Sequence, residues 1–280
     1  MDLDADGDLD VVISNDAPDP KLVYLNDGKG HFHVGSSFGK PAWPTRNATV
    51  ADINGDGLPD IVAANRGDST DANYICPNRG TGRFDGECIA FSREPATTIT
   101  AADFNRDGLI DLAVPHRDGG QSRVYLAGPK GTFDRARTIP FGPPNATIRM
   151  AEAADLDGDG LVDLVAIDEN VGTAIYFGQR DGSLSAAVRV ADAKPAPYAL
   201  AVVDVNRDGK PDIVVGNIEA PSAVYFNDGT GRQFHTIRFG DGKGTVYGFA
   251  IADLDRDGVM DIAAARSEAP NVVYFGRLTK

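Results

Sequence analysis

The nine residues Asp155-Leu-Asp-Gly-Asp-Gly-Leu-Val-Asp163 decide the fold, because the pattern that they follow occurs six times in this chain of 280 residues. The shared pattern is Asp-x-Asp/Asn-x-Asp-Gly-x-x-Asp. Its copies begin at Asp2, Asp52, Asp103, Asp155, Asp204 and Asp253, so successive copies are 50, 51, 52, 49 and 49 residues apart. A fixed period of this length is typical of a repeat architecture in which every repeat forms one supersecondary unit.

The same pattern carries a chemical signature. Positions 1, 3, 5 and 9 hold side chains with hard oxygen donors, and the side chains at positions 1, 3 and 5 of so short a turn can converge on one point. Glycine at position 6 permits the bend, usually with positive φ. Oxygen-only ligands without Cys or His favour Ca²⁺ over zinc or copper. The sequence therefore predicts up to six Ca²⁺ sites, one in each loop.

The predicted ligands occupy equivalent positions in all six loops. The side-chain ligands, at positions 1, 3, 5 and 9, are Asp2, Asp4, Asp6 and Asp10; Asp52, Asn54, Asp56 and Asp60; Asp103, Asn105, Asp107 and Asp111; Asp155, Asp157, Asp159 and Asp163; Asp204, Asn206, Asp208 and Asp212; and Asp253, Asp255, Asp257 and Asp261. The backbone-oxygen ligands, at position 7, are Asp8, Leu58, Leu109, Leu161, Lys210 and Val259.

Two other interpretations of these loops are possible. One is an Asp/Gly-rich turn that binds no metal, and it has more force for the first loop, which has no strand-like segment before it. The other is an EF-hand or dockerin loop, which needs helices on both sides and, for the EF-hand, a Glu at position 12. Position 12 is apolar in most copies, as at Ile13 and Val114, so the EF-hand is rejected.

The negative net charge of the chain agrees with the binding of several metal cations. The formal net charge is −14, and 21 of the 41 acidic residues are Asp at predicted ligand positions. Six divalent cations would bring the net charge close to −2. The charge argues against nucleic acid or an anionic membrane surface as a partner. No apolar run approaches 18 residues, so we expect no membrane insertion by this chain.

Between the loops, the repeats share short β-branched or aromatic runs bounded by Gly, Asn and Asp. Examples are Asp212–Gly216 after a loop and Val224–Phe226 before an Asn-Asp-Gly turn. Innermost strands, beside the loops, are expected to be buried on both faces. A fourth strand is expected to open on a phenylalanine, at Phe32, Phe84, Phe133 or Phe234. Four short strands per 50 residues predict an all-β fold, a β-propeller of four-stranded blades.

This template resembles the FG-GAP/VCBS-type repeat, found in the propeller of integrin α subunits and in many bacterial extracellular proteins. The six loops in register carry the resemblance, which covers nearly the whole chain. It implies a single β-propeller domain over residues 1–280, in which each loop joins the first and second strands of a blade and holds Ca²⁺. The approximate repeat units are 1–46, 47–96, 97–147, 148–197, 198–246 and 247–280. The first and last units are incomplete, and the family's frequent seven-bladed form allows for a seventh blade outside this chain.

The N-terminus and the cysteines bear on location. Residues 1–10 contain neither a basic segment nor an apolar one, so we expect no signal peptide in this chain and expect the chain to be a fragment of a longer secreted protein. The expected location is extracellular, periplasmic or at the cell surface. Cys76 and Cys88 bracket one hairpin, and in such a protein a disulfide is favoured over two reduced thiols.

The functional expectation is a calcium-binding extracellular module for binding, adhesion or scaffolding, with a protein or glycan ligand on a propeller face. No catalytic or cofactor-binding residue is predicted, because the chain has no nucleophile motif, no Cys/His pairing and no phosphate-binding glycine loop. The alternatives are a calcium-dependent polysaccharide lyase or hydrolase, a lectin, or a purely structural segment of a larger surface protein. An enzyme would need acid and base groups that depart from the template. The departures are Arg117, Asp118, Glu152, Asp168 and Glu169.

Overall fold

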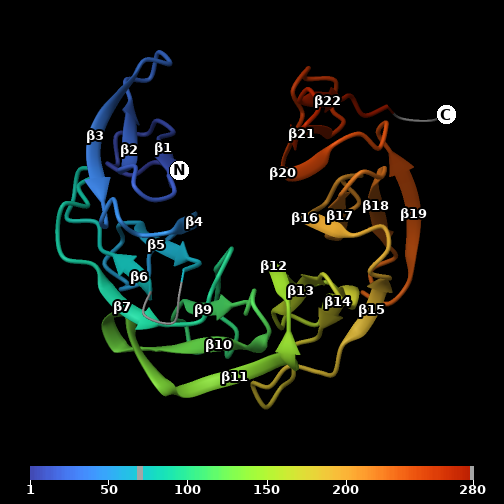
Figure 1. The fold of residues 1–280 in the computed structure, drawn as a ribbon, viewed down its shortest axis with the longest axis horizontal. Coiled ribbons are helices and arrows are strands. Elements are labelled where there is room, and N and C mark those ends of the chain that lie inside the picture. Colours follow the sequence, from blue (N-terminus) through green and yellow to red (C-terminus); the bar gives the residue numbers. More distant parts are fainter. Residues whose placement is uncertain (68–71, 278–280) are drawn as a thin grey trace. The chain divides into compact units, whose positions relative to one another are not determined.

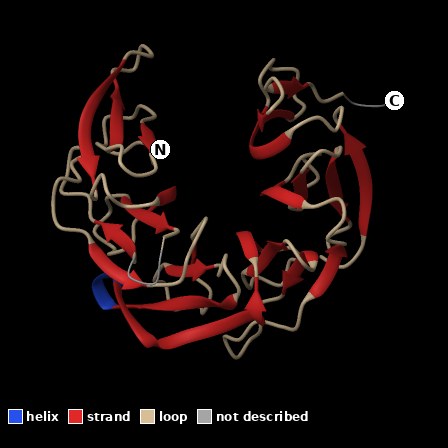
Figure 2. Ribbon diagram, in the orientation of Figure 1, coloured by secondary structure: helices blue, strands red, loops and turns tan. Residues whose placement is uncertain are grey.

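The computed structural model describes residues 1–67 and 72–277. The chain forms two compact units, Met1–Ala146 and Thr147–Lys280, and each is described by itself. Strands account for almost all of the regular structure (Figure 2), and the described residues contain a single short 3₁₀ turn, η1 (Pro129–Gly131). None of the described helical structure has the length and hydropathy needed to cross a bilayer.

The first unit contains three antiparallel sheets, each built from strands that are consecutive in the chain (Figure 1). The first sheet has three strands and the other two have four. The strands are β1 (Val11–Ile13), β2 (Lys21–Asn26) and β3 (Phe32–Phe38); β4 (Thr45–Ala51), β5 (Asp60–Asn65), β6 (Asn73–Cys76) and β7 (Ile89–Ser92); and β8 (Thr100–Ala102), β9 (Asp111–Val114), β10 (Gly120–Gly128) and β11 (Thr132–Ala146).

The second unit follows the same scheme. Its first two sheets have four strands and its last sheet has three. The strands are β12 (Ile148–Ala154), β13 (Asp163–Asp168), β14 (Gly172–Tyr176) and β15 (Val188–Ala191); β16 (Pro197–Val203), β17 (Asp212–Asn217), β18 (Ser222–Asn227) and β19 (Phe234–Phe239); and β20 (Thr245–Ala252), β21 (Asp261–Ser267) and β22 (Val272–Tyr274).

Six antiparallel sheets in chain order are the blades of a six-bladed β-propeller, so the predicted fold class is confirmed. Among the described residues, the first and last sheets have three strands each, one fewer than the other four.

Burial within a blade differs from the expectation in one respect. In the four-stranded sheets the strand that follows the loop is fully buried: every residue of β5, β9, β13 and β17 is buried. The strand that precedes the loop, such as β12 or β16, is only partly buried. The reason is topological, because this first strand lies at the edge of its sheet, whereas the second strand has a hydrogen-bonded neighbour on both sides.

The expectation that the fourth strand of a repeat opens on a phenylalanine is wrong in the second repeat. Phe32, Phe133 and Phe234 lie at the start of β3, β11 and β19, but Phe84 precedes β7 by several residues. Phe84 is 1% exposed and belongs to an apolar core with Leu3 and Trp43. Phe84 is therefore buried in this core and does not begin a strand.

Apolar cores form between successive sheets. In the first unit, Val62 and Ile75 of one sheet share a cluster with Leu112 of the next. In the second unit, Val165 of β13 shares a cluster with Ile213 of β17. Burial of these side chains contributes about 1.5–3 kcal/mol each, and it holds the loops that join first and second strands in fixed positions.

Candidate metal centre

Each acidic loop lies immediately before the second strand of its blade. Asp155–Asp163, for example, runs from the end of β12 to the start of β13, and Asp204–Asp212 runs from β16 to β17. Position 9 of the pattern is the first residue of the buried second strand in five loops, and in the first loop Asp10 directly precedes β1. The loops therefore occupy the place that the repeat template predicts.

The same hydrogen bonds shape all six loops. The backbone N–H of the glycine at position 6 donates to Oδ2 of the aspartate at position 1, at 2.7–3.0 Å. The N–H of position 7 donates to Oδ1 of the aspartate at position 5, at 2.8–3.0 Å. These bonds wrap the loop backbone around its own carboxylates.

The aspartate at position 9 is buried and is held from two sides. Its Oδ2 accepts the N–H of position 2 in the same loop, at 2.7–3.1 Å. Its Oδ1 accepts a backbone N–H from a residue at the end of the third strand or just after it, at 2.8–3.0 Å. Burial raises the pKa of Asp111 and of Asp163 to about 6, despite these hydrogen bonds.

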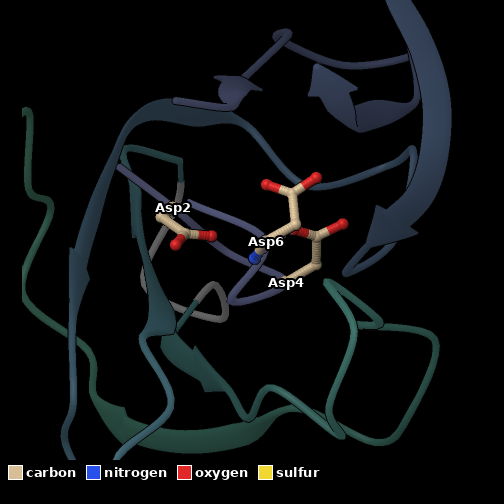
Figure 3. Close-up of side chains that lie close together, drawn as sticks. All are labelled: Asp2, Asp4 and Asp6. Atoms are coloured by element: carbon tan, nitrogen blue, oxygen red, sulfur yellow. Dashed lines mark hydrogen bonds between the residues drawn. The ribbon is translucent and has the colours of Figure 1, made fainter. Parts of the chain in front are cut away.

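Three loops bring carboxylate oxygens together. Asp2, Asp4 and Asp6 form one such group (Figure 3), Asp155, Asp157 and Asp163 a second, and Asp253, Asp255 and Asp257 a third. In each group, one oxygen of every residue lies within 4.8 Å of the others. Within the described residues, the structure thus assembles half of the predicted ligand sets as three-carboxylate clusters.

The other three loops carry asparagine at position 3, and among the described residues they form no cluster of three carboxylates. In two of them the asparagine amide is turned toward position 5. Asn105 Nδ2 donates to Asp107 Oδ2 at 3.0 Å, and Asn206 Nδ2 donates to Asp208 Oδ2 at 3.2 Å. A neutral amide here reduces the negative charge that the loop offers to a cation.

Two carboxylate oxygens within the clusters are buried and have no hydrogen-bond donor: Asp157 Oδ1 and Asp253 Oδ1. A buried carboxylate oxygen without a partner is costly, because it has lost its water. Burial, together with the charge of Asp159, raises the pKa of Asp157 above its usual value. A hard cation would supply the missing partner, so these residues fit Ca²⁺.

Sequence reasoning missed the backbone at position 4. All six loops adopt a left-handed conformation there, with φ between +60° and +75°, and four of these residues are not glycine: Ala5, Arg106, Arg207 and Arg256. The glycines at position 4 of the second and fourth loops, Gly55 and Gly158, were the available signal.

Sequence reasoning also missed a link between neighbouring loops. Asn78 Nδ2 donates to the carbonyl of Leu3 at 2.8 Å and to that of Pro59 at 3.2 Å, so it connects the first loop to the second. Asn227 makes the same pair of bonds to Leu156 and Pro211, connecting the fourth loop to the fifth. The signal was the asparagine that opens each Asn-x-Gly-type turn.

The structure also shows the contacts of the two cysteines and of two charged residues that depart from the repeat template. Cys76 and Cys88 form a disulfide, with their Cα atoms 4.2 Å apart. Asp118 accepts a hydrogen bond of 2.6 Å from Arg66. Asp168 Oδ1 accepts the N–H of residue 170, and its Oδ2 accepts that of residue 147.

Glu152 lies on β12 opposite Val165 and is partly buried. Burial raises the pKa of Glu152 to about 7.

Comparison with known families agrees with this architecture. The model of the FG-GAP-like repeat matches residues 2–63, 52–114, 103–166, 155–215 and 204–264. The chain belongs to the FG-GAP-like repeat family. Each matched FG-GAP segment runs from one acidic loop through the second strand of the following blade, so the family's repeat and the loop period coincide. A comparison with curated proteins gives no match.

The solved structures similar to this FG-GAP chain include a propeller. The structure of the Dos1 propeller has a TM-score of 0.55 at 11% identity, over 83% of this chain and 55% of that one. BBS1N in complex with ARL6DN has a TM-score of 0.52 at 14% identity, over 81% and 67%. The V. cholerae biofilm matrix protein Bap1 is a weaker match, with a TM-score of 0.44 at 19% identity, over 79% and 36%. The chain thus spans about half of the Dos1 propeller structure, and these likenesses concern the fold.

Proposed function

We propose that this FG-GAP propeller is a calcium-stabilised binding or scaffold module that works outside the cytoplasm. The observation that carries the calcium proposal is the pair of buried, unpartnered oxygens on Asp157 and Asp253, each inside a cluster of three carboxylates. The disulfide between Cys76 and Cys88 supports an oxidising compartment.

Each loop would hold one Ca²⁺ through the side chains at positions 1, 3, 5 and 9 and the backbone oxygen at position 7. When bound, the cation neutralises carboxylates that otherwise repel one another, and it ties the first strand of a blade to the second. The residues of the chain prepare this site by orienting the carboxylates with backbone N–H groups, as Gly160 does for Asp155 at 2.9 Å. The expected role of calcium is therefore structural.

The calcium proposal can be tested by counting bound ions. Isothermal titration of the chelator-treated protein with Ca²⁺ should reveal several sites, with those of the first, fourth and sixth loops tightest, because they carry four carboxylates each. A protein that binds no Ca²⁺ at millimolar concentration, while keeping its β-sheet circular dichroism, would disprove the proposal.

We also propose that the module binds its partner without transforming it. The charged residues that depart from the repeat template support this view where their contacts are known. Asp118 is paired with Arg66, and Asp168 caps its turn by accepting backbone N–H groups. BBS1N, a propeller that this chain resembles in fold, was solved in complex with a second protein. Incubation with a panel of polysaccharides should therefore show retention without product release; cleavage of any glycan would favour the enzyme alternative.

A further inference from the structure

The first unit contains a cavity of about 790 Å³ beside the disulfide-bridged hairpin. Its walls include Lys40, Trp43, Tyr74, Arg79, Glu87 and Ile89. None of the predicted calcium ligands lines it. The cavity is thus separate from the acidic loops, and its chemistry can be considered independently of the metal.

One wall is a rigid aromatic pair. The rings of Trp43 and Tyr74 are stacked with their centroids 3.9 Å apart and their planes 10° apart. Trp43 packs so closely on Gly39 that a Cβ at Gly39 would overlap the indole ring. The buried Lys21 Nζ donates to the carbonyl of Trp43 at 2.8 Å, which fixes the backbone beneath the ring.

Another part of the wall belongs to the hairpin between Cys76 and Cys88, which the disulfide closes. Arg79 lies across Gly86, where any side chain would overlap the guanidinium group. Absence of a side chain at Gly86 therefore lets Arg79 occupy the rim of the cavity. The disulfide and the glycine together give the arginine a defined place.

The charge of the cavity is opposite to that of the protein. Two exposed cations, Lys40 and Arg79, and one exposed carboxylate, Glu87, line the cavity, whereas the chain as a whole carries −14. A cavity with an aromatic wall and excess positive charge suits a ring that is apolar on one face and bears a carboxylate. A pyranose with a carboxyl group has both properties.

We propose that this cavity binds a uronic-acid unit of an acidic polysaccharide. The exposed part of the Tyr74 ring, which is backed by the buried Trp43, contacts the C–H face of the sugar. Arg79 and Lys40 bind the carboxylate, and Glu87 accepts a hydrogen bond from a hydroxyl group. This inference rests on the proposed role as a binding module, but it does not require that calcium contact the sugar.

The single tryptophan of the chain provides the signal for a test. A tetrasaccharide of galacturonic acid is titrated into the calcium-loaded protein while Trp43 fluorescence is followed, with isothermal titration as the second readout. Maltotetraose, a neutral sugar of equal length, is the matched ligand. We expect saturable binding of the acidic sugar and at least about tenfold weaker binding of the neutral one.

Variants on the exposed rim test the site without disturbing the core. Arg79→Ala and Lys40→Ala should each weaken binding about tenfold. Arg83→Ala is the matched control, because Arg83 is exposed on the same hairpin, pairs with Asp85 and does not line the cavity. It should leave the affinity unchanged.

Several outcomes would overturn the proposal. They are no saturable binding of the acidic sugar, equal binding of maltotetraose, and full binding by both Arg79→Ala and Lys40→Ala, which would assign the interaction to calcium bridging. Equal losses in Arg83→Ala would point to unspecific charge attraction and would overturn it as well. Calcium titration of the same samples reports separately on the metal sites, so failure of one proposal is distinguishable from failure of the other.

Discussion

The side-chain amide of Asn227 donates a 2.8 Å hydrogen bond to the backbone carbonyl of Leu156, which lies 71 residues earlier in the chain. Leu156 is position 2 of the fourth acidic loop, and Asn227 is the last residue of β18, the third strand of the next blade. Both the asparagine and its acceptor are buried. One side chain thus joins the acidic loops of neighbouring blades within the second unit.

Removing this link should destabilise the fold. Asn227→Ala deletes the two hydrogen bonds that the side chain donates, to Leu156 and to Pro211, and the two that it accepts from the N–H groups of Gly229 and Gly231. It leaves the buried Leu156 carbonyl without this donor. We expect a loss of about 1–3 kcal/mol in the free energy of unfolding, measured by urea denaturation. Asn26→Ala is the control, because the Asn26 amide donates only to Leu9, in an exposed part of the first sheet. Equal losses in the two variants would mean that the link between blades adds nothing.

Chelation should lower the thermal stability of the whole protein. Without a cation, the carboxylates of each cluster repel one another, and the linkage energy of several bound ions is lost. EDTA should reduce the melting temperature by well over about 10 °C, followed by circular dichroism, and added Ca²⁺ should restore it. A melting curve that EDTA leaves in place would contradict structural calcium.

Loss of one loop should cost less than chelation. Asp157→Ala removes one carboxylate from the fourth loop, and we expect the calcium stoichiometry to fall by one with a smaller decrease in melting temperature. Asp192→Ala serves as the control, since Asp192 is an exposed aspartate that pairs only with Arg189 at the surface. Such surface pairs contribute about 0–1 kcal/mol. An unchanged stoichiometry in Asp157→Ala would remove the fourth loop from the set of sites.

Position 4 of the loops offers a test of backbone strain. Arg106 has φ +61°, a conformation that costs a residue with a Cβ about 1 kcal/mol relative to glycine. Arg106→Gly should therefore be neutral or slightly stabilising. Arg180→Gly, in an exposed turn where φ is not positive, should destabilise by about 0.5–1 kcal/mol through the entropy of the unfolded chain. If both variants lose the same stability in urea denaturation, position 4 is not strained.

Glu152 should make stability depend on pH. Its pKa is raised by burial from 4.5 to about 7, so the folded state holds this proton more tightly than the unfolded state does. The stability that comes from the protonated side chain is present at low pH and is lost as pH rises from about 4.5 to about 7. Glu152→Gln should therefore be more stable than the parent at pH 8, by roughly 1–3 kcal/mol, and close to it at pH 4. Denaturation at both pH values, with Ca²⁺ present, measures this; a gain of equal size at both would exclude titration of Glu152.

The fold followed from the sequence because its determinants are local and repeated. Six copies of one loop, each followed by a β-branched run such as Ile213–Val215, define blade number and strand order without knowledge of any distant contact. Phe84 was misplaced because its position depends on a core built from Leu3 and Phe38, far away in sequence. The local sequence pattern around Phe84 does not show whether this residue begins a strand or is buried in that core.

The candidate site was predictable at the level of residue type, since only side-chain oxygens recur at positions 1, 3, 5 and 9. The roles of Asn78 and Asn227 were not, because they depend on a carbonyl in the preceding blade. Likewise, no pattern distinguishes Asp157, which keeps an oxygen without a donor, from Asp159, whose Oδ1 accepts the N–H of Leu161. That difference arises only when the loop is folded.

The double anchoring of Asp163 has a kinetic consequence. Its two oxygens are already held by the N–H groups of Leu156, in the loop, and of Gly178, just after the third strand. A binding ion therefore does not have to order the Asp163 side chain. The entropic cost of ordering falls only on the rest of the loop, residues 155–162. Ion exchange should then proceed by opening of residues 155–162, while the strand that begins at Asp163 stays in place.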